Sequence, residues 1–123
     1  MDWRQLTDLA KEVRLPRKLS DSSEAGSVAA AILTDRGNVY RGVCIDTPSA
    51  LGFCAEHAAI AAMITAGESR VVQLVAVGED GPMPPCGRCR EFLYQIDKGN
   101  LDCEILLRDK VVTLNDLLPE RWN

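Results

Sequence analysis

The 123-residue sequence contains no long apolar run. Its longest apolar stretches, such as Ala58–Thr65, are far shorter than the roughly 20 residues that a membrane-spanning helix needs. The first segment, Met1–Leu19, carries charged residues throughout and lacks the apolar core of a secretory signal. We therefore expect a cytoplasmic protein that has no membrane partner.

Positive charge is also scarce. Lys and Arg number 14 against 18 Asp and Glu, which gives a formal net charge of −4. The only basic cluster is Arg14–Lys18, which we interpret as a solvated helix end or loop. Proteins that bind nucleic acids usually carry a basic stripe, because neutralising phosphates supplies much of their affinity. The charge balance therefore favours a small free substrate over a nucleic-acid partner.

Internal repeats, low-complexity tracts and long linkers are absent as well. Hydrophobic residues make up 46% of the chain, enough for a core, and charged residues make up 26%, an ordinary share for a globular protein. A chain of this length fits one domain. We predict a single domain over residues 1–123.

Hydrophobic spacing and turn residues predict four helical and four extended segments. The helices are expected at Asp2–Leu15, Cys54–Ala66, Cys86–Asp97 and Leu114–Leu118, and the strands at Val28–Leu33, Val39–Ile45, Val71–Val77 and Cys103–Leu107. Ser20–Gly26 and Gly81–Pro85 are expected to be loops. The helix that starts at Cys54 is apolar nearly all round, which is typical of a buried helix. This order of elements predicts an α/β fold with helices packed on a sheet.

Five cysteines lie at positions 44, 54, 86, 89 and 103. An odd number without a secretory signal favours metal ligands, catalytic groups or buried apolar residues over disulfides. Cys44 and Cys103 lie in strand-like runs, so we interpret them as buried apolar residues.

Three of the cysteines form a pattern typical of a metal site. Cys86 and Cys89 are three residues apart at the start of a predicted helix, so both face the same way. Cys54 begins another predicted helix and would supply a third sulfur. Three protein ligands and one open position are the arrangement of a catalytic zinc. Glu56 can face the same site only if Cys54 has a non-helical backbone, because residues two apart on a helix point to opposite sides.

Cys54-Ala55-Glu56 followed by Pro85-Cys86-Gly87-Arg88-Cys89 is the signature of zinc deaminases in its three-cysteine form. The chain resembles the cytidine deaminase family and, within it, the blasticidin S deaminase branch. The resemblance implies a three-layer fold, with a mixed sheet of about five strands and helices on both faces. It also implies zinc-dependent hydrolytic deamination of a cytosine nucleoside or derivative, and a homotetramer whose active sites draw on neighbouring subunits.

The resemblance also implies roles for individual residues. Cys54, Cys86 and Cys89 would hold Zn²⁺, and Glu56 would move the protons. The substrate would contact Cys44, Asp46 and Ala55, while His57, Arg88 and Arg90 would surround the metal ligands.

Four features depart from the family pattern. His57 replaces an Arg that offsets the thiolate charge, a task that Arg88 or Arg90 would then share. Cys44 and Asp46 replace an Asn-x-Glu pair that binds ribose, and the loop from there to Cys54 is one residue shorter. Gly26 replaces an aromatic residue that packs on the pyrimidine, which we interpret as room for a bulkier substrate. We therefore expect the chemistry to be kept and the preferred substrate to differ from cytidine.

Three other hypotheses remain open from the residues alone. A structural zinc site would need a fourth ligand, for which Cys44 or His57 is available. The Cys86-to-Cys89 spacing also occurs in redox motifs, although only 34 residues follow it (123 minus 89). A deaminase-like binding subunit with weak catalysis is the third, and the intact Glu56 argues against it. Trp3 and Trp122 are expected in the core or at an interface.

Overall fold

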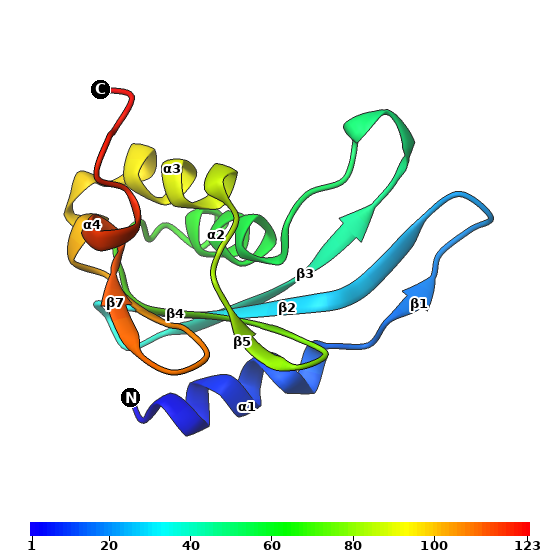
Figure 1. Cartoon of the computed structure of the whole chain (residues 1–123), viewed down its shortest axis with the longest axis horizontal. Helices are drawn as coiled ribbons and strands as arrows, with labels where there is room; N and C mark the ends of the chain where they lie inside the picture. Colours follow the sequence, from blue (N-terminus) through cyan, green and yellow to red (C-terminus); the bar gives the residue numbers. More distant parts are fainter.

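A mixed sheet lies at the centre of the protein, with helices on both of its faces (Figure 1). The structure is a computed structural model that describes residues 1–123. Its helices are α1 (Trp3–Val13), α2 (Ala55–Thr65), α3 (Gly87–Ile96) and α4 (Leu114–Leu117), with short 3₁₀ turns at Pro48–Ala50 and Lys98–Asp102. Its strands are β1 (Arg17–Lys18), β2 (Glu24–Thr34), β3 (Val39–Asp46), β4 (Val71–Gly78), β5 (Gly81–Met83), β6 (Glu104–Leu106) and β7 (Val111–Thr113).

The sheet runs in the order β1-β2-β4-β6-β7, with β3 also paired to β2 and β5 also paired to β4. All pairs are antiparallel except β4 with β6, which are parallel. In the chain, α3 lies between β4 and β6 and packs on one face of the sheet, so it forms the connection between these two parallel strands. The sheet is therefore mixed, as the sequence led us to expect.

Side chains of β2 alternate between two cores, because successive residues of a strand point to opposite faces. Ala29, Ala31 and Leu33 pack with α1 on one face. Ala30 and Ile32 pack with α2 and α3 on the other face. Small side chains let the helices approach closely: a Cβ at Gly42 of β3 would lie 2.5 Å from the backbone nitrogen of Ala59. This close packing fixes where α2 begins, and hence where the candidate site lies.

The α/β class, the layers and the eight main elements agree with the sequence analysis, and each predicted boundary is met within a few residues. The sheet has seven strands, however, where about five were expected. The additional strands β1, β5 and β7 are only two or three residues long. Two predicted loops are partly extended as a result: β2 begins at Glu24, and Gly81–Met83 pairs with β4.

The prediction that α2 is buried is only half right. Ala55, Glu56, Ala59, Ile60 and Met63 are buried, but the opposite side of the helix is open and leaves Ile64 43% exposed. Trp3 packs against the core on the α1 face. Trp122 is 84% exposed, so it is not a core residue.

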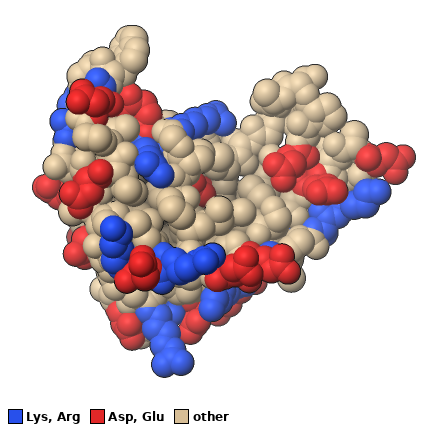
Figure 2. Space-filling model, viewed as in Figure 1, with Lys and Arg blue, Asp and Glu red and all other residues tan.

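Charged side chains of both signs are interspersed on the face shown in Figure 2. None of the helices combines the length and the apolarity that crossing a membrane requires.

Glu68 links the end of α2 to the β2–β3 hairpin. Its carboxylate accepts hydrogen bonds from the Tyr40 hydroxyl at 2.6 Å and from Asn38 Nδ2 at 2.9 Å. The hydrogen bond from Tyr40, followed by that from Thr34, lowers the pKa of Glu68 below its usual 4.5. A carboxyl whose pKa is lower in the folded state stabilises the fold above its unfolded pKa, and this contribution disappears as pH falls through the folded value.

We predict that Glu68→Gln lowers the melting temperature at pH 7, because the variant cannot offer a carboxylate to Tyr40. The gap to wild type should close as pH falls from 7 to below 4.5, because wild-type Glu68 becomes protonated only below its usual pKa. Thermal unfolding followed by circular dichroism across this range measures both effects. Glu120→Gln, an exposed change, is the control; equal pH profiles for wild type and Glu68→Gln would contradict the prediction.

Candidate metal centre and substrate pocket

Cys54 and Glu56 reach the same site because α2 begins between them. Cys54 is the N-cap of α2 and has an extended backbone, with φ −74° and ψ 157°. Glu56 lies in the first helical turn and is only 3% exposed. The non-helical geometry that the sequence analysis required of Cys54 is present.

Cys86 and Cys89 approach from the start of α3 in the same manner. Cys86 is the N-cap, with φ −66° and ψ 161°, and Cys89 lies buried one turn further on. The free N–H groups and the dipole of a helix start favour negative charge. Two such helix starts therefore face each other, and each presents thiols that can act as thiolates.

The four side chains form one compact cluster. The Sγ atom of Cys86 lies 3.0 Å from that of Cys54 and 3.4 Å from that of Cys89. The backbone N–H of Cys86 donates to Glu56 Oε2 at 3.4 Å. The potential ligand atoms of all four residues lie within 4.8 Å of one another.

The thiols of the cluster differ in their affinity for protons. Burial and the hydrogen bond with Cys86 raise the pKa of Cys54 to about 11. Burial, reinforced by the nearby Glu56 carboxylate, raises the pKa of Cys89. Burial acts in the same direction on Cys86, but hydrogen bonds with Cys54 and Cys89 outweigh it and lower the pKa of Cys86. The pKa of Cys86 is thus shifted in the direction opposite to those of its two neighbours.

This donor set fits zinc. Thiolates about 2.3 Å from one tetrahedral zinc lie ~3.7 Å apart, so the sulfurs need to separate only by several tenths of an ångström. Sulfur donors in a tetrahedral arrangement select zinc over harder cations such as magnesium. Neither Cys44 nor His57, the two candidates for a fourth ligand of a structural site, belongs to the cluster.

His57 is packed between two aromatic rings. Its ring centroid lies 5.0 Å from that of Phe53 and 4.8 Å from that of Phe92. Its Nδ1 is buried and has no hydrogen-bond partner. Burial and the nearby Arg88 lower the pKa of His57 below 6.5, so the imidazole is neutral at pH 7. His57 therefore supplies no positive charge to the thiolates.

The two arginines near the cluster have different surroundings. Arg90 is engaged with backbone carbonyls: Nε donates to Pro85 at 2.8 Å and Nη1 to Leu117 at 3.3 Å. These bonds connect the residue before Cys86 to α4. Arg88 is exposed, forms no ion pair, and lines a pocket together with Cys54. Arg88 is therefore the free cation beside the cluster.

A small inner pocket of about 150 Å³ opens directly onto the cluster. Its lining is mostly apolar and comes from both helix starts, from β2 to β4 and from the end of β5: Val28, Cys44, Cys54, Ala55, Glu56, Ala76, Met83, Pro84 and Cys86. An apolar pocket with a few converging polar groups is the usual form of a small-molecule site. Its size suits one flat ring beside the thiols and Glu56.

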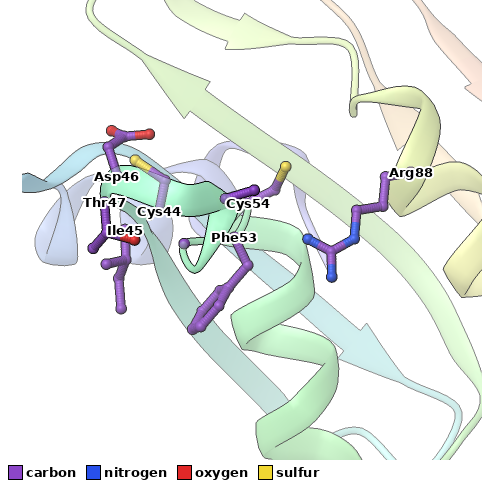
Figure 3. Close-up of a pocket in the computed structure, with 9 residues that line it drawn as sticks. Cys44, Ile45, Asp46, Thr47, Phe53, Cys54 and Arg88 are labelled. Atoms are coloured by element: carbon purple, nitrogen blue, oxygen red, sulfur yellow. The ribbon is translucent and has the colours of Figure 1, made fainter.

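An outer pocket of about 310 Å³ adjoins the inner one, since Cys44 and Cys54 line both (Figure 3). Asp46 also lines the outer pocket. The sulfur of Cys44, by contrast, lies 3.2 Å from Ser27 Oγ and accepts a hydrogen bond from the backbone N–H of Val28 at 3.3 Å. Two of the three residues expected to contact substrate, Cys44 and Ala55, thus line the inner pocket, and Asp46 lines the outer one.

Gly26 does not make room for a substrate, contrary to the expectation from the sequence. It lines neither pocket, and its φ of +86° turns the position of a side chain toward the backbone carbonyl of Leu15. Only glycine adopts this conformation freely. Gly26 is therefore explained by a bulge in β2 and by close packing against the segment after α1.

The sequence analysis missed several pocket residues. Thr47 was not singled out, and Met83 and Pro84 were placed only in a loop, yet all three line a pocket. Phe53 and Phe92 were not recognised as the partners of His57. No local motif identifies these residues, because their proximity arises from the tertiary fold.

The site and the fold have counterparts among known proteins. Residues 4–103 match the family model described as "Cytidine and deoxycytidylate deaminase zinc-binding region". The chain is 33% identical over 124 residues to a cytidine deaminase of Mycobacterium tuberculosis. The alignment covers 99% of this chain and 90% of that protein. It is 34% identical over 101 residues to the cytidine deaminase of Halalkalibacterium halodurans, covering 75% of this chain and 74% of that one. The crystal structure of cytidine deaminase from Mycobacterium leprae matches with a TM-score of 0.82 at 30% identity, covering 98% of this chain and 99% of that one.

We predict that the purified protein contains about one zinc per chain and that Cys86→Ala loses most of it, because two thiolates bind zinc much more weakly than three. Metal analysis by mass spectrometry after gentle purification measures the content. Cys44→Ser is the matched control, since it replaces a cysteine outside the cluster. Loss of zinc in Cys44→Ser as well would instead support a closed structural site with Cys44 as a ligand.

Proposed function

The chain belongs to the cytidine and deoxycytidylate deaminase family, and on that premise we propose that it hydrolyses the amino group of a free cytosine nucleoside or related cytosine derivative, releasing ammonia. One observation carries this proposal. Three thiols and the buried carboxylate of Glu56 converge within 4.8 Å at the edge of a pocket that suits a single ring.

In this proposal Cys54, Cys86 and Cys89 would hold a zinc ion, which would supply a nucleophile at neutral pH by making a water molecule more acidic. The apolar lining of the inner pocket excludes other water and orients the ring with C4 toward the thiols.

Glu56 is the proton carrier. Its carboxylate takes a proton from the attacking water as the new C4–O bond forms, and it delivers that proton to N3 of the ring. It then transfers the second proton of the water to the amino nitrogen, so that the C4–N bond breaks and ammonia leaves. General acid–base catalysis of this kind contributes typically 10²–10⁴-fold. Burial of Glu56 against the Cys86 N–H keeps the carboxylate in one position for both transfers.

The substrate of this chain is proposed to be one for which ribose contacts matter less, as in the blasticidin S deaminase branch. Two observations support this. The sulfur of Cys44 is already engaged by Val28 and Ser27, so it replaces none of the hydrogen bonds of an amide side chain. Asp46 has a shorter side chain than the Glu of the family pattern and is exposed.

A homotetramer and a cytoplasmic location complete the proposal. The open side of α2 exposes Ile64, and the loop before α2 exposes 77% of Leu51, which gives apolar surface that further copies of the chain would bury. All five cysteines are free, and a reducing compartment keeps thiols available for zinc.

We predict that Glu56→Gln keeps the fold and the zinc but lowers kcat by about 10²–10⁴-fold, since it preserves shape and removes the proton carrier. Ammonia release and zinc content are measured on the same preparation. Glu79→Gln, in the exposed β4–β5 turn, serves as the control. Activity within tenfold of wild type would exclude Glu56 as the general acid–base, whereas loss of zinc would identify it as a ligand.

We also predict that cytidine is a poorer substrate than at least one other cytosine derivative. Each charged hydrogen bond that ribose fails to make costs about ten- to hundredfold in kcat/KM. Ammonia release from cytidine, deoxycytidine and blasticidin S, with kcat/KM for each, tests this. Cytidine as the best of the three would contradict the proposed branch without affecting the proposed chemistry.

A further inference from the structure

Arg90 directly follows the last cysteine of the cluster and is tied to the backbone at two points. Its Nε donates to the carbonyl of Pro85 at 2.8 Å, and its Nη1 donates to the carbonyl of Leu117, the last residue of α4, at 3.3 Å. No backbone N–H donates to the Pro85 carbonyl. Arg90 is half-buried and forms no ion pair, so its charge is directed at these two oxygens.

The carbonyl of Pro85 belongs to the same peptide unit as the N–H of Cys86. This unit is planar and trans, so its C=O and its N–H point in opposite directions. Arg90 Nε holds the oxygen at one end of the unit. At the other end, the N–H of Cys86 donates to Glu56 Oε2 at 3.4 Å. A continuous series of hydrogen bonds therefore runs from the Arg90 guanidinium, through one peptide unit, to the carboxylate of Glu56.

This series acts on Glu56 both mechanically and electrostatically. A rotation of the peptide unit would turn the Cys86 N–H away from the carboxylate, and the hydrogen bond from Arg90 opposes that rotation. A hydrogen bond from a charged donor is stronger than one between neutral groups, and hydrogen bonds in series polarise one another. The Arg90 charge therefore makes the Cys86 N–H a better donor to Glu56.

The segment before Cys86 has few other hydrogen bonds that could fix this peptide unit. Three of the four residues before Cys86 are prolines, which have no N–H to donate. Pro84 and Pro85 lie beyond the end of β5, so no hydrogen bond of the sheet holds them. The orientation of the peptide next to the cluster thus depends on Arg90.

The second hydrogen bond of Arg90 anchors its guanidinium to α4, which lies beside α3 (Figure 1). The last carbonyls of a helix lack partners within the helix, so the carbonyl of Leu117 is available to an external donor. α4 begins with a capping box in which the Thr113 hydroxyl accepts from the N–H of Asp116 at 3.2 Å. α4 is therefore a defined support for one end of the guanidinium, whose other end holds Pro85.

We propose that Arg90 is a positioning residue for the reaction: through the Pro85–Cys86 peptide it directs the Cys86 N–H toward Glu56 and so holds the carboxylate where it moves protons. Arg90 lines neither pocket, so it acts through the backbone and not by contact with a substrate. The inference rests on the proposed function only in treating Glu56 as the proton carrier. It gives Arg90 a task other than offsetting the charge of the thiolates.

Two substitutions of Arg90 test the proposal by steady-state kinetics at saturating zinc. Arg90→Gln should lower kcat about ten- to hundredfold, the usual effect of losing a partner that supports a metal site from outside. KM should stay unchanged, because substrate binding does not involve Arg90. Arg90→Lys keeps the charge but reaches only one of the two carbonyls, so it should restore part of kcat. Ammonia release is measured with whichever of cytidine, deoxycytidine and blasticidin S wild type prefers.

The orientation of the Cys86 N–H is measured without reference to activity, as the hydrogen-exchange rate of this amide by NMR on the zinc-loaded protein. Arg90→Gln should accelerate this exchange about two- to tenfold, which corresponds to the net contribution of one hydrogen bond. Arg90→Lys should give an intermediate rate.

Two control variants separate this role from a structural one. Thr113→Ala removes the capping box and so loosens α4 without changing Arg90 or Pro85. Arg4→Gln, an exposed change on α1 at the opposite face of the sheet, removes the same charge elsewhere. Both variants should keep the kcat and the Cys86 exchange rate of wild type.

A double-mutant cycle tests whether Arg90 acts through Glu56. Arg90→Gln made in the Glu56→Gln background should lower kcat less than about threefold further, because the group that Arg90 positions is already absent. The same two substitutions would have independent, multiplying effects if Arg90 acted elsewhere.

Three results would each overturn the proposal: an equal loss of kcat in Thr113→Ala, an undiminished effect of Arg90→Gln in the Glu56→Gln background, or unchanged Cys86 exchange in both Arg90 variants. Arg90→Lys carries the same tests if Arg90→Gln fails to fold. Absence of ammonia release from wild type would instead refute the proposed deamination, and the exchange rates would still decide whether Arg90 orients the Cys86 amide.

Discussion

The site depends on one constraint: two helices begin at the same place on one face of the sheet, and each begins with a cysteine in extended conformation. An N-cap residue has its side chain beside the free N–H groups of the first turn rather than on a helix face. Cys54 and Cys86 therefore point along the ends of α2 and α3, toward each other. Had either backbone been helical, its sulfur would have rotated away and Glu56 would have faced a different region from the thiols.

Packing against the sheet determines where the two helix starts lie. β2 offers alanines to both faces, and Gly42 of β3 allows the backbone of α2 to approach within contact distance. α3 is held at its start by Arg90, which donates to the carbonyl of Pro85 and to that of Leu117. Packing density in such a core resists small shifts, so the backbone positions at the two helix starts are held firmly. The metal centre is accordingly preorganised by apolar packing more than by polar bonds among the ligands.

The sequence predicts the features that depend on local order. β-branched runs, the apolar spacing of α1 and the positions of prolines indicate eight elements, and ligand spacing indicates the cluster. The sequence does not predict β1, β5 and β7, because segments of two or three residues are too short to show a periodic pattern. They become strands only by pairing with a neighbouring strand. Gly26 was misinterpreted for a related reason. Its φ of +86° decides where a side chain at this position would point, and the sequence pattern does not reveal that angle. The exposed side of α2 was missed because apolar composition alone does not distinguish a buried helix face from an exposed one.

The departures from the family pattern leave the cluster itself unchanged. Cys54, Glu56 and Cys86 line the inner pocket, Cys89 belongs to the same cluster, and all four fit the pattern. The change at position 57 alters the charge beside the cluster, whereas Asp46 keeps the sign of the Glu that it replaces. His57, neutral between Phe53 and Phe92, cannot supply the positive charge that an arginine would at that position. The nearest free cation is Arg88, on the other helix, where it faces the outer pocket as well as Cys54. The positive charge beside the cluster therefore comes from α3 rather than from α2. Because Arg88 also lines the outer pocket, a group bound there would change the electrostatic potential at the cluster. A substrate group that pairs with Arg88 would then also alter the potential at the thiolates, so recognition and reactivity in this protein are expected to depend on the same side chain.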